Sequence, residues 1–142
     1  MKAKEAKEEV KEVKGLKVIL SQILILGQGG LGEVHPAINE FAQLPLRASI
    51  AFKMRKIFRQ VTEQIEDFNE IRREVLLKFG KLDENGKFNF TDNDSAMKFQ
   101  LEIQELLKNE VVIEGEKIGL FDLGDVQVST AVLFNLEWLI AD

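Results

Sequence analysis

The residues best suited to chemistry in this chain are four glycines within a nine-residue stretch, LGQGGLGEV, at positions 26–34. They are Gly27, Gly29, Gly30 and Gly32, and an apolar segment, ILIL, leads into them. Glycines between a strand and a helix let backbone amides approach a phosphate group at the N-terminus of the helix. The spacing therefore predicts either a phosphate-binding loop or a flexible connector.

The surrounding sequence favours the flexible connector. A dinucleotide-binding unit needs a second strand that ends in an acidic residue about 20 residues later, but that interval holds Pro45 and the start of a helical pattern. A kinase-like site would use Lys53 and Asp122, yet no His-Arg-Asp triplet exists, and His35 is the only histidine. We therefore expect a flexible loop, no cofactor, no metal site and no catalytic residue, so the chain is predicted not to be an enzyme.

Size and composition fit one core. A chain of 142 residues with 45% hydrophobic residues can bury a core without metals or disulfides, and the absence of cysteine excludes thiolate chemistry. The net charge of −5 indicates neither a strongly basic nucleic-acid binder nor an acidic mimic of nucleic acid. The longest apolar run, residues 18–26, is about half of the ~20 residues that a membrane helix needs, so we expect no membrane span.

The strongest pattern in the sequence is a long amphipathic helix over residues 46–79. Apolar residues recur there at steps of three or four from Ile50 to Phe79, which is the period of one helical face. At ~1.5 Å per residue, this helix would be on the order of 50 Å long, which is more than one small core covers. Part of its surface should therefore need a partner.

The outer face of this helix changes sign along its length. Its first half carries Arg47, Lys53, Arg55, Lys56 and Arg59, and its second half carries Glu63, Glu66, Glu70 and Glu74. This order opposes the helix dipole, so helix stability alone does not explain it. Phe52 and Leu77 also fall on this polar face, whereas Arg72 falls within the apolar stripe and should need a carboxylate partner.

Three interpretations of the charge pattern stay open. Two copies could pair antiparallel, so that each basic half meets the acidic half of the other copy. The basic half could instead bind the phosphates of a nucleic acid or a nucleotide. The charges could also be unselected, because exposed charges contribute little individually.

The remaining segments predict an α+β fold, in which the long helix packs antiparallel on a second helix, with a small antiparallel sheet and a C-terminal helix. Residues 16–26 form a strand, alone or followed by a short helix that Ser21 caps. Gly80 is expected to end the long helix in the left-handed conformation, and Asn85-Gly86 to form a tight turn. We expect a charged arm over residues 1–15 and a single domain over residues 16–142.

The second half of the chain supplies the second helix, the sheet and the last helix. The second helix starts near Asp94 and places on one face Met97, Leu101, Leu106 and Leu107. Three β-like pieces follow at residues 111–113, 118–120 and 126–128. Ser129 is the expected N-cap of the last helix.

Five short segments carry a family resemblance: LPL at 44–46, FGK at 79–81, DENG at 83–86, ELL at 105–107 and LEWL at 136–139. Together they resemble a family of small uncharacterised proteins of tailed bacteriophages and prophages, over residues 16–140. The charged arm and the glycine-rich loop depart from that family, and none of the shared segments is catalytic. The resemblance implies expression in the cytoplasm of a bacterial host, and an accessory role as a virion or assembly component.

We therefore expect protein partners and a homo-oligomer, with contacts through the helix faces. The alternative is an anti-host or replication factor that binds a nucleic acid or a nucleotide through the basic half of the long helix.

Overall fold

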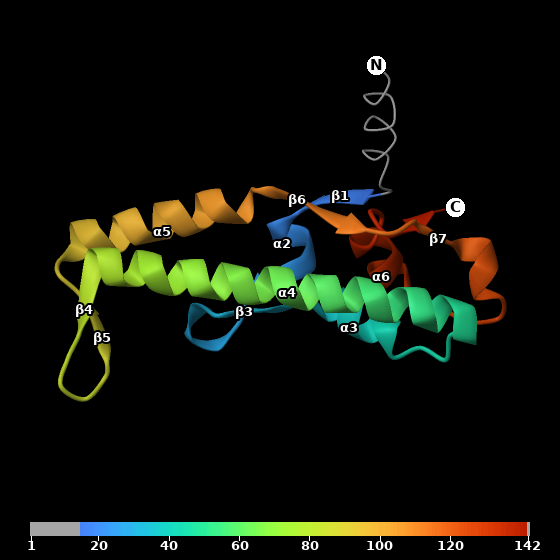
Figure 1. The fold of residues 1–142 in the computed structure, drawn as a ribbon, viewed down its shortest axis with the longest axis horizontal. Helices are drawn as coiled ribbons and strands as arrows, with labels where there is room; N and C mark the ends of the chain where they lie inside the picture. Colours follow the sequence, from blue (N-terminus) through green and yellow to red (C-terminus); the bar gives the residue numbers. More distant parts are fainter. Residues whose placement is uncertain (1–14, 142) are drawn as a thin grey trace, which may run out of the picture. The chain divides into compact units, whose positions relative to one another are not determined.

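Figure 1 shows a computed structural model of the chain, which describes residues 15–141. The charged arm predicted over residues 1–15 lies, except for Gly15, outside the described residues. The described residues form two compact units: unit 1 holds residues 15–18, 36–60 and 111–141, and unit 2 holds residues 19–35 and 61–110. The single domain predicted over residues 16–142 stays a prediction.

Helix α4 (Ala48–Phe79) confirms the long helix, and it contributes residues 48–60 to unit 1 and residues 61–79 to unit 2. Its apolar stripe is buried at Ile50, Met54, Ile57, Val61, Ile65 and Phe68. Further along the helix the stripe is less covered, because Ile71 is 43% exposed and Val75 is only half-buried. The expectation that one core does not cover the whole stripe thus holds for its last turns.

Unit 1 packs two helices, α3 (Pro36–Ala42) and α6 (Thr130–Asn135), with the first part of α4 and with short strands. Strand β1 (Gly15–Ile19) pairs with β6 (Glu110–Glu114), and β7 (Ile118–Gly119) pairs in parallel with β8 (Ile140–Ala141). The side chains of Ile38, Phe41, Ile113, Leu136 and Leu139 are fully buried in its core.

The start of α6 confirms one prediction, and the segment before it corrects another. Ser129 caps α6, since its hydroxyl accepts a hydrogen bond from the amide of Val132 at 3.2 Å. The strand predicted at residues 126–128 is wrong, because these residues have no regular structure and follow the 3₁₀ helix η2 (Leu120–Leu123) and a turn at residues 124–125. The amide of Val126 donates to the carbonyl of Leu123 rather than to a neighbouring strand.

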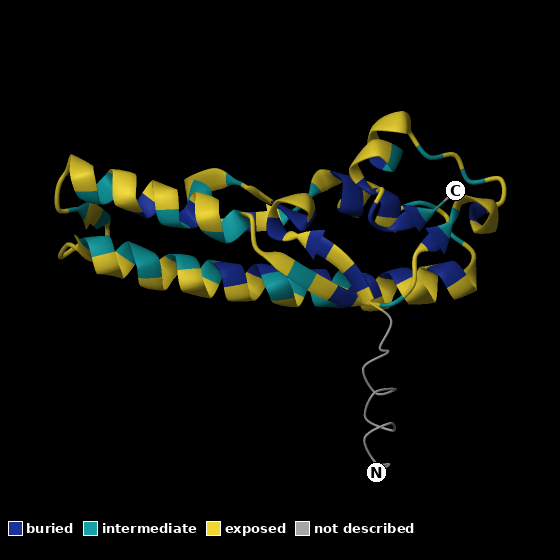
Figure 2. Cartoon of the chain, turned by 90° about the horizontal axis from the view of Figure 1, so that it is seen from above, coloured by how far each residue is buried: buried dark blue, intermediate teal, exposed yellow. Residues whose placement is uncertain are grey.

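Unit 2 contains α2 (Leu20–Ile23), two antiparallel hairpins and helix α5 (Asn93–Leu107). Strand β2 (Leu24–Leu26) pairs with β3 (Gly32–Val34), and β4 (Gly80–Leu82) pairs with β5 (Phe88–Phe90). Helix α5 runs antiparallel along residues 61–79 of α4 (Figures 1 and 2), and an ion pair joins Lys78 to Glu102 at 2.9 Å. The predicted α+β fold with its antiparallel helix pair is confirmed.

The buried face of α5 is not the face on which the sequence pattern places Met97 and Leu101. Phe99 and Ile103 are buried, whereas Met97 and Leu101 are 65% and 62% exposed. At about 100° per residue, positions two apart lie on nearly opposite sides of a helix, so both pairs satisfy the same period. The ring of Phe90 in β5, 5.5 Å from the ring of Phe99, marks the side that faces the core.

The predictions for Gly80 and Ser21 at the ends of helices are also wrong. Gly80 does not adopt the left-handed conformation but begins β4, where a Cβ atom would collide with the carbonyl of Asn89 and the ring of Phe88. Ser21 lies inside α2 rather than at its N-cap, which is Ile19. The turn at Asn85-Gly86 is confirmed, since Gly86 has a φ of 81° at the tip of the β4–β5 hairpin.

Candidate interaction surfaces

The glycine loop forms the tip of the β2–β3 hairpin in unit 2, with a short 3₁₀ turn, η1 (Gln28–Gly30). Amides of the loop are already used within the hairpin: that of Gly27 donates to the carbonyl of Leu31 at 2.7 Å, and that of Gly30 donates to the carbonyl of Gly27 at 3.0 Å. The carboxylate of Glu33 lies against Gly27, where a Cβ atom would collide with it. Because a phosphate loop needs free amides and no adjacent anion, this geometry disfavours phosphate binding.

Two side chains of α4 hold this hairpin. The side-chain amide of Asn69 accepts from the amide of Gly32 at 2.8 Å and donates to its carbonyl at 3.2 Å. Arg72 donates to the carbonyl of Gly29 at 2.6 Å, its guanidinium lies 5.9 Å from the ring centroid of Phe99, and burial lowers its pKa. The expected carboxylate partner of Arg72 is therefore wrong, since a backbone carbonyl and an aromatic face satisfy it. The predicted flexibility of the loop stays a prediction.

We call the cations on the outer face of α4 in unit 1 the basic segment: Lys53, Arg55, Lys56 and Arg59. All four are exposed, and none forms an ion pair within residues 15–141. Phe52 lies among them with 63% of its side chain exposed, and the ammonium group of Lys56 lies 5.3 Å from the centroid of its ring. The segment thus combines an exposed aromatic ring with four positive charges.

Arg47, which was predicted to belong to the same contact face, is engaged inside unit 1. Its Nε and Nη2 atoms both donate to the backbone carbonyl of Asp122, at 2.9 and 2.7 Å. These two bonds hold η2, which is followed by its C-cap Gly124 with a φ of 61°. The sequence could not reveal this role, because the two residues lie 75 positions apart.

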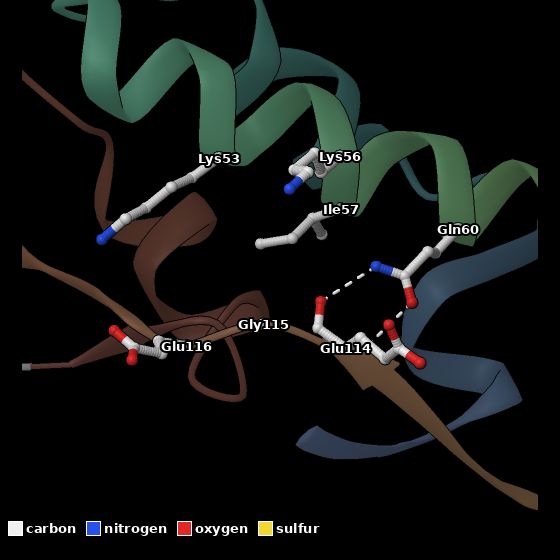
Figure 3. Close-up of a pocket in the computed structure, with 7 residues that line it drawn as sticks. All are labelled: Lys53, Lys56, Ile57, Gln60, Glu114, Gly115 and Glu116. Atoms are coloured by element: carbon white, nitrogen blue, oxygen red, sulfur yellow. Dashed lines mark hydrogen bonds between the residues drawn. The ribbon is translucent and has the colours of Figure 1, made fainter. Parts of the chain in front are cut away.

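A shallow pocket of about 500 Å³ lies beside the basic segment, between α4 and residues 114–116 (Figure 3). Lys53 and Lys56 extend from α4 on this side, and Glu114 and Glu116 lie across from them (Figure 3). The side-chain amide of Gln60 donates to the carbonyl of Glu114 at 2.9 Å and accepts from its amide at 2.8 Å. Charges of both signs line this pocket, so it does not select an anion, and its lining includes no serine, threonine or histidine.

In unit 2, the outer face of α4 carries what we call the acidic segment: Glu63, Glu66, Glu70 and Glu74. These four carboxylates are exposed, as the sequence predicts. Leu77 lies on the same face and is 47% exposed. The sign change along the helix surface is thus present in exposed side chains.

Unit 1 has a further surface, which we call the aromatic patch: Leu120, Phe121, Leu133 and Phe134. It was not predicted from the sequence. Phe121 is 91% exposed at η2, and Phe134 is 72% exposed on α6. Next to them lies a pocket of about 290 Å³ lined by Leu120, Thr130, Leu133, Phe134, Glu137 and Ile140. The helical period contained one signal, since Phe134 lies on the opposite side of α6 from the buried Val132.

Within residues 15–141, no group of three or more His, Asp or Glu side chains is placed to hold a metal ion. None of the helices in the same range combines the length and the apolar composition that a bilayer crossing requires. Comparison with known protein families, with curated proteins and with solved structures gives no significant match to this chain.

Proposed function

We propose that the protein acts through protein–protein contacts as a phage accessory protein, as a component of the virion or of its assembly in the bacterial host, with the outer face of α4 as a contact surface. The resemblance of segments such as LPL and LEWL to phage proteins suggests this setting. The observation that carries the contact itself is Phe52, an aromatic side chain 63% exposed on an otherwise charged surface. Aromatic residues and arginine are enriched at protein interfaces, and both occur here. A second copy of the chain is among the proposed partners.

Affinity capture from phage-infected host cells tests this proposal when wild type is compared with Phe52→Ser. We expect a partner protein to be captured by the wild type and lost with the variant, because the ring supplies most of the apolar area in the basic segment. The matched control is Leu101→Ser, which removes an equally exposed apolar side chain, 62% exposed, from α5. Equal capture by wild type and Phe52→Ser would contradict the assigned surface.

One observation favours a second candidate, the binding of a nucleic acid. The four cations of the basic segment form no ion pairs within the described part of the chain, so phosphates could replace their water. The carboxylates of Glu114 and Glu116 beside Lys53 and Lys56 weaken this candidate. Fluorescence anisotropy with labelled single- and double-stranded DNA decides it, since the logarithm of the affinity should fall with that of the salt concentration by about 0.9 per phosphate contact.

A further inference from the structure

The basic segment needs a counterpart of defined chemistry. An aromatic ring among four cations fits an apolar pocket with an acidic surround, because the ring then leaves water while the charges meet opposite charges. The aromatic ring and the four cations lie on one stretch of α4 within unit 1, from Phe52 to Arg59. A matching surface should therefore have a cavity large enough for a phenyl ring and an excess of carboxylates.

The aromatic patch has these properties. Its pocket of about 290 Å³ is well above the ~150 Å³ of a cavity that holds a benzene molecule. Residues 120–141 contain Asp122, Asp125 and Glu137 and no Lys, Arg or His. The three acidic residues are exposed, and Glu137 lines the pocket itself. Residues 120–141 of unit 1 thus offer an apolar pocket whose own segment carries only acidic side chains, and Arg47 reaches that segment through the backbone carbonyl of Asp122.

We propose that the aromatic patch of one copy binds the basic segment of a second copy, with Phe52 of the second copy entering the pocket beside Phe134. This inference rests on the proposed function and names the partner of the α4 surface. The two surfaces are different parts of unit 1, so the contact is heterologous, and each copy still offers one free surface after pairing. Such contacts extend into chains or close into rings, which suits an assembly component.

The aromatic patch is a better counterpart than the acidic segment of α4. Exposed ion pairs by themselves typically contribute ~0–1 kcal/mol, and the acidic segment adds only Leu77 as an exposed apolar residue on its face. The aromatic patch adds two rings, of Phe121 and Phe134, which are 91% and 72% exposed. Burial of exposed aromatic side chains is the usual source of hot-spot energy at interfaces.

Sedimentation velocity of the full chain at rising concentration tests the proposal with complementary variants. Phe52→Ser disables the basic segment, and Phe134→Ser disables the aromatic patch. We expect wild type to grow beyond a dimer or to close into a ring, with association weakened at least tenfold by high salt. Each variant alone should stay monomeric. An equimolar mixture of the two should form a heterodimer that stops at two chains, because only one intact pair of surfaces remains.

Two further variants and one control measurement keep the result unambiguous. Glu137→Lys reverses a charge at the rim of the pocket and should weaken association at least tenfold, even if Phe134→Ser impairs folding. Leu77→Ser should behave as wild type, because the acidic segment takes no part. Circular dichroism of every variant checks its fold.

Several outcomes would overturn the proposal. They are a wild type that is monomeric at all concentrations, a Phe52→Ser variant that associates like wild type, a mixture that stays monomeric, and a Leu77→Ser variant that loses association. The last would support antiparallel pairing of α4 instead. A monomeric wild type whose partner capture still depends on Phe52 would refute only this inference, whereas capture independent of Phe52 would refute the proposed function.

Discussion

The side chain of Gln60 bonds to β6 as a neighbouring strand would. The loss of stability on removal of this side chain is the most quantitative prediction. Its amide forms both hydrogen bonds that a strand residue would offer to the backbone of Glu114, at 2.9 and 2.8 Å. Strand β6 pairs with β1, so Gln60 provides further bonding at its C-terminal end. The contact joins two segments of unit 1 that lie 54 positions apart in sequence.

The expected loss of stability follows from these two bonds. A net contribution of ~0.5–1.5 kcal/mol for each bond gives about 1–3 kcal/mol for Gln60→Ala. The lower end applies because Gln60 is half-buried and Glu114 is exposed, so water replaces the lost partners. Alanine also has the higher helix propensity, which offsets a few tenths of a kcal/mol. We therefore expect a loss of about 1 kcal/mol, or a Tm lower by about 3 °C.

Gln60→Glu is the sharper variant. It keeps the length of the side chain and the acceptor for the amide of Glu114, but it sets a carboxylate oxygen against the carbonyl oxygen of Glu114. It should therefore destabilise at least as much as Gln60→Ala, although it is nearly isosteric.

Urea unfolding followed by the fluorescence of Trp138 measures these effects, because this residue is the only tryptophan and lies in unit 1 with Gln60. Gln64→Ala is the control, since Gln64 occupies the next turn of α4 and its side chain has no hydrogen-bond partner within residues 15–141. Equal urea midpoints for Gln60→Ala and Gln64→Ala would refute the reasoning.

Three further predictions concern single side chains. Arg47→Ala removes both bonds to the carbonyl of Asp122 and should cost about 1 kcal/mol in urea unfolding, with Arg47→Lys in between, because one ammonium group cannot reproduce the fork. Trp138 buries its Nε1–H without a hydrogen-bond partner among residues 15–141, a defect worth ~1–3 kcal/mol. Trp138→Phe should therefore cost far less than the ~3–5 kcal/mol of Trp138→Ala in unfolding followed by circular dichroism. Burial lowers the pKa of His35 in the folded chain. As the pH falls below ~6.5, the imidazole is therefore protonated in the unfolded chain before it is protonated in the folded chain. The stability that depends on neutral His35 is thus present above that pH and is lost as the pH falls through the lowered pKa. The variant His35→Gln should flatten this part of a curve of Tm against pH.

Local patterns in the sequence were sufficient for the helices and one turn. The period of the apolar residues in α4, the hydroxyl of Ser129 at the start of α6 and the Asn85-Gly86 pair each act within a few residues of chain. The exposure of the basic and acidic segments follows from the same period. These features were predictable because their physical causes are local.

Features that depend on the neighbours of a segment were decided only by tertiary structure. The period of α5 allowed either Met97 or Phe99 to face inward, and packing against α4 and β5 selected Phe99. A glycine such as Gly80 fits the left-handed end of a helix as well as it fits a strand. Here it lies in β4, because β5 approaches its backbone too closely for a side chain.

The same reason explains the contact surfaces. The sequence placed Arg47 on an outer face and Arg72 opposite a carboxylate, but the fold brought a backbone carbonyl to each of them. The aromatic patch likewise exists only because η2 and α6, which are separate in sequence, share one pocket. The sequence by itself determined which side chains α4 exposes, and the tertiary structure decided which exposed side chains gather around a cavity, because a cavity is formed by residues that the chain brings together only on folding.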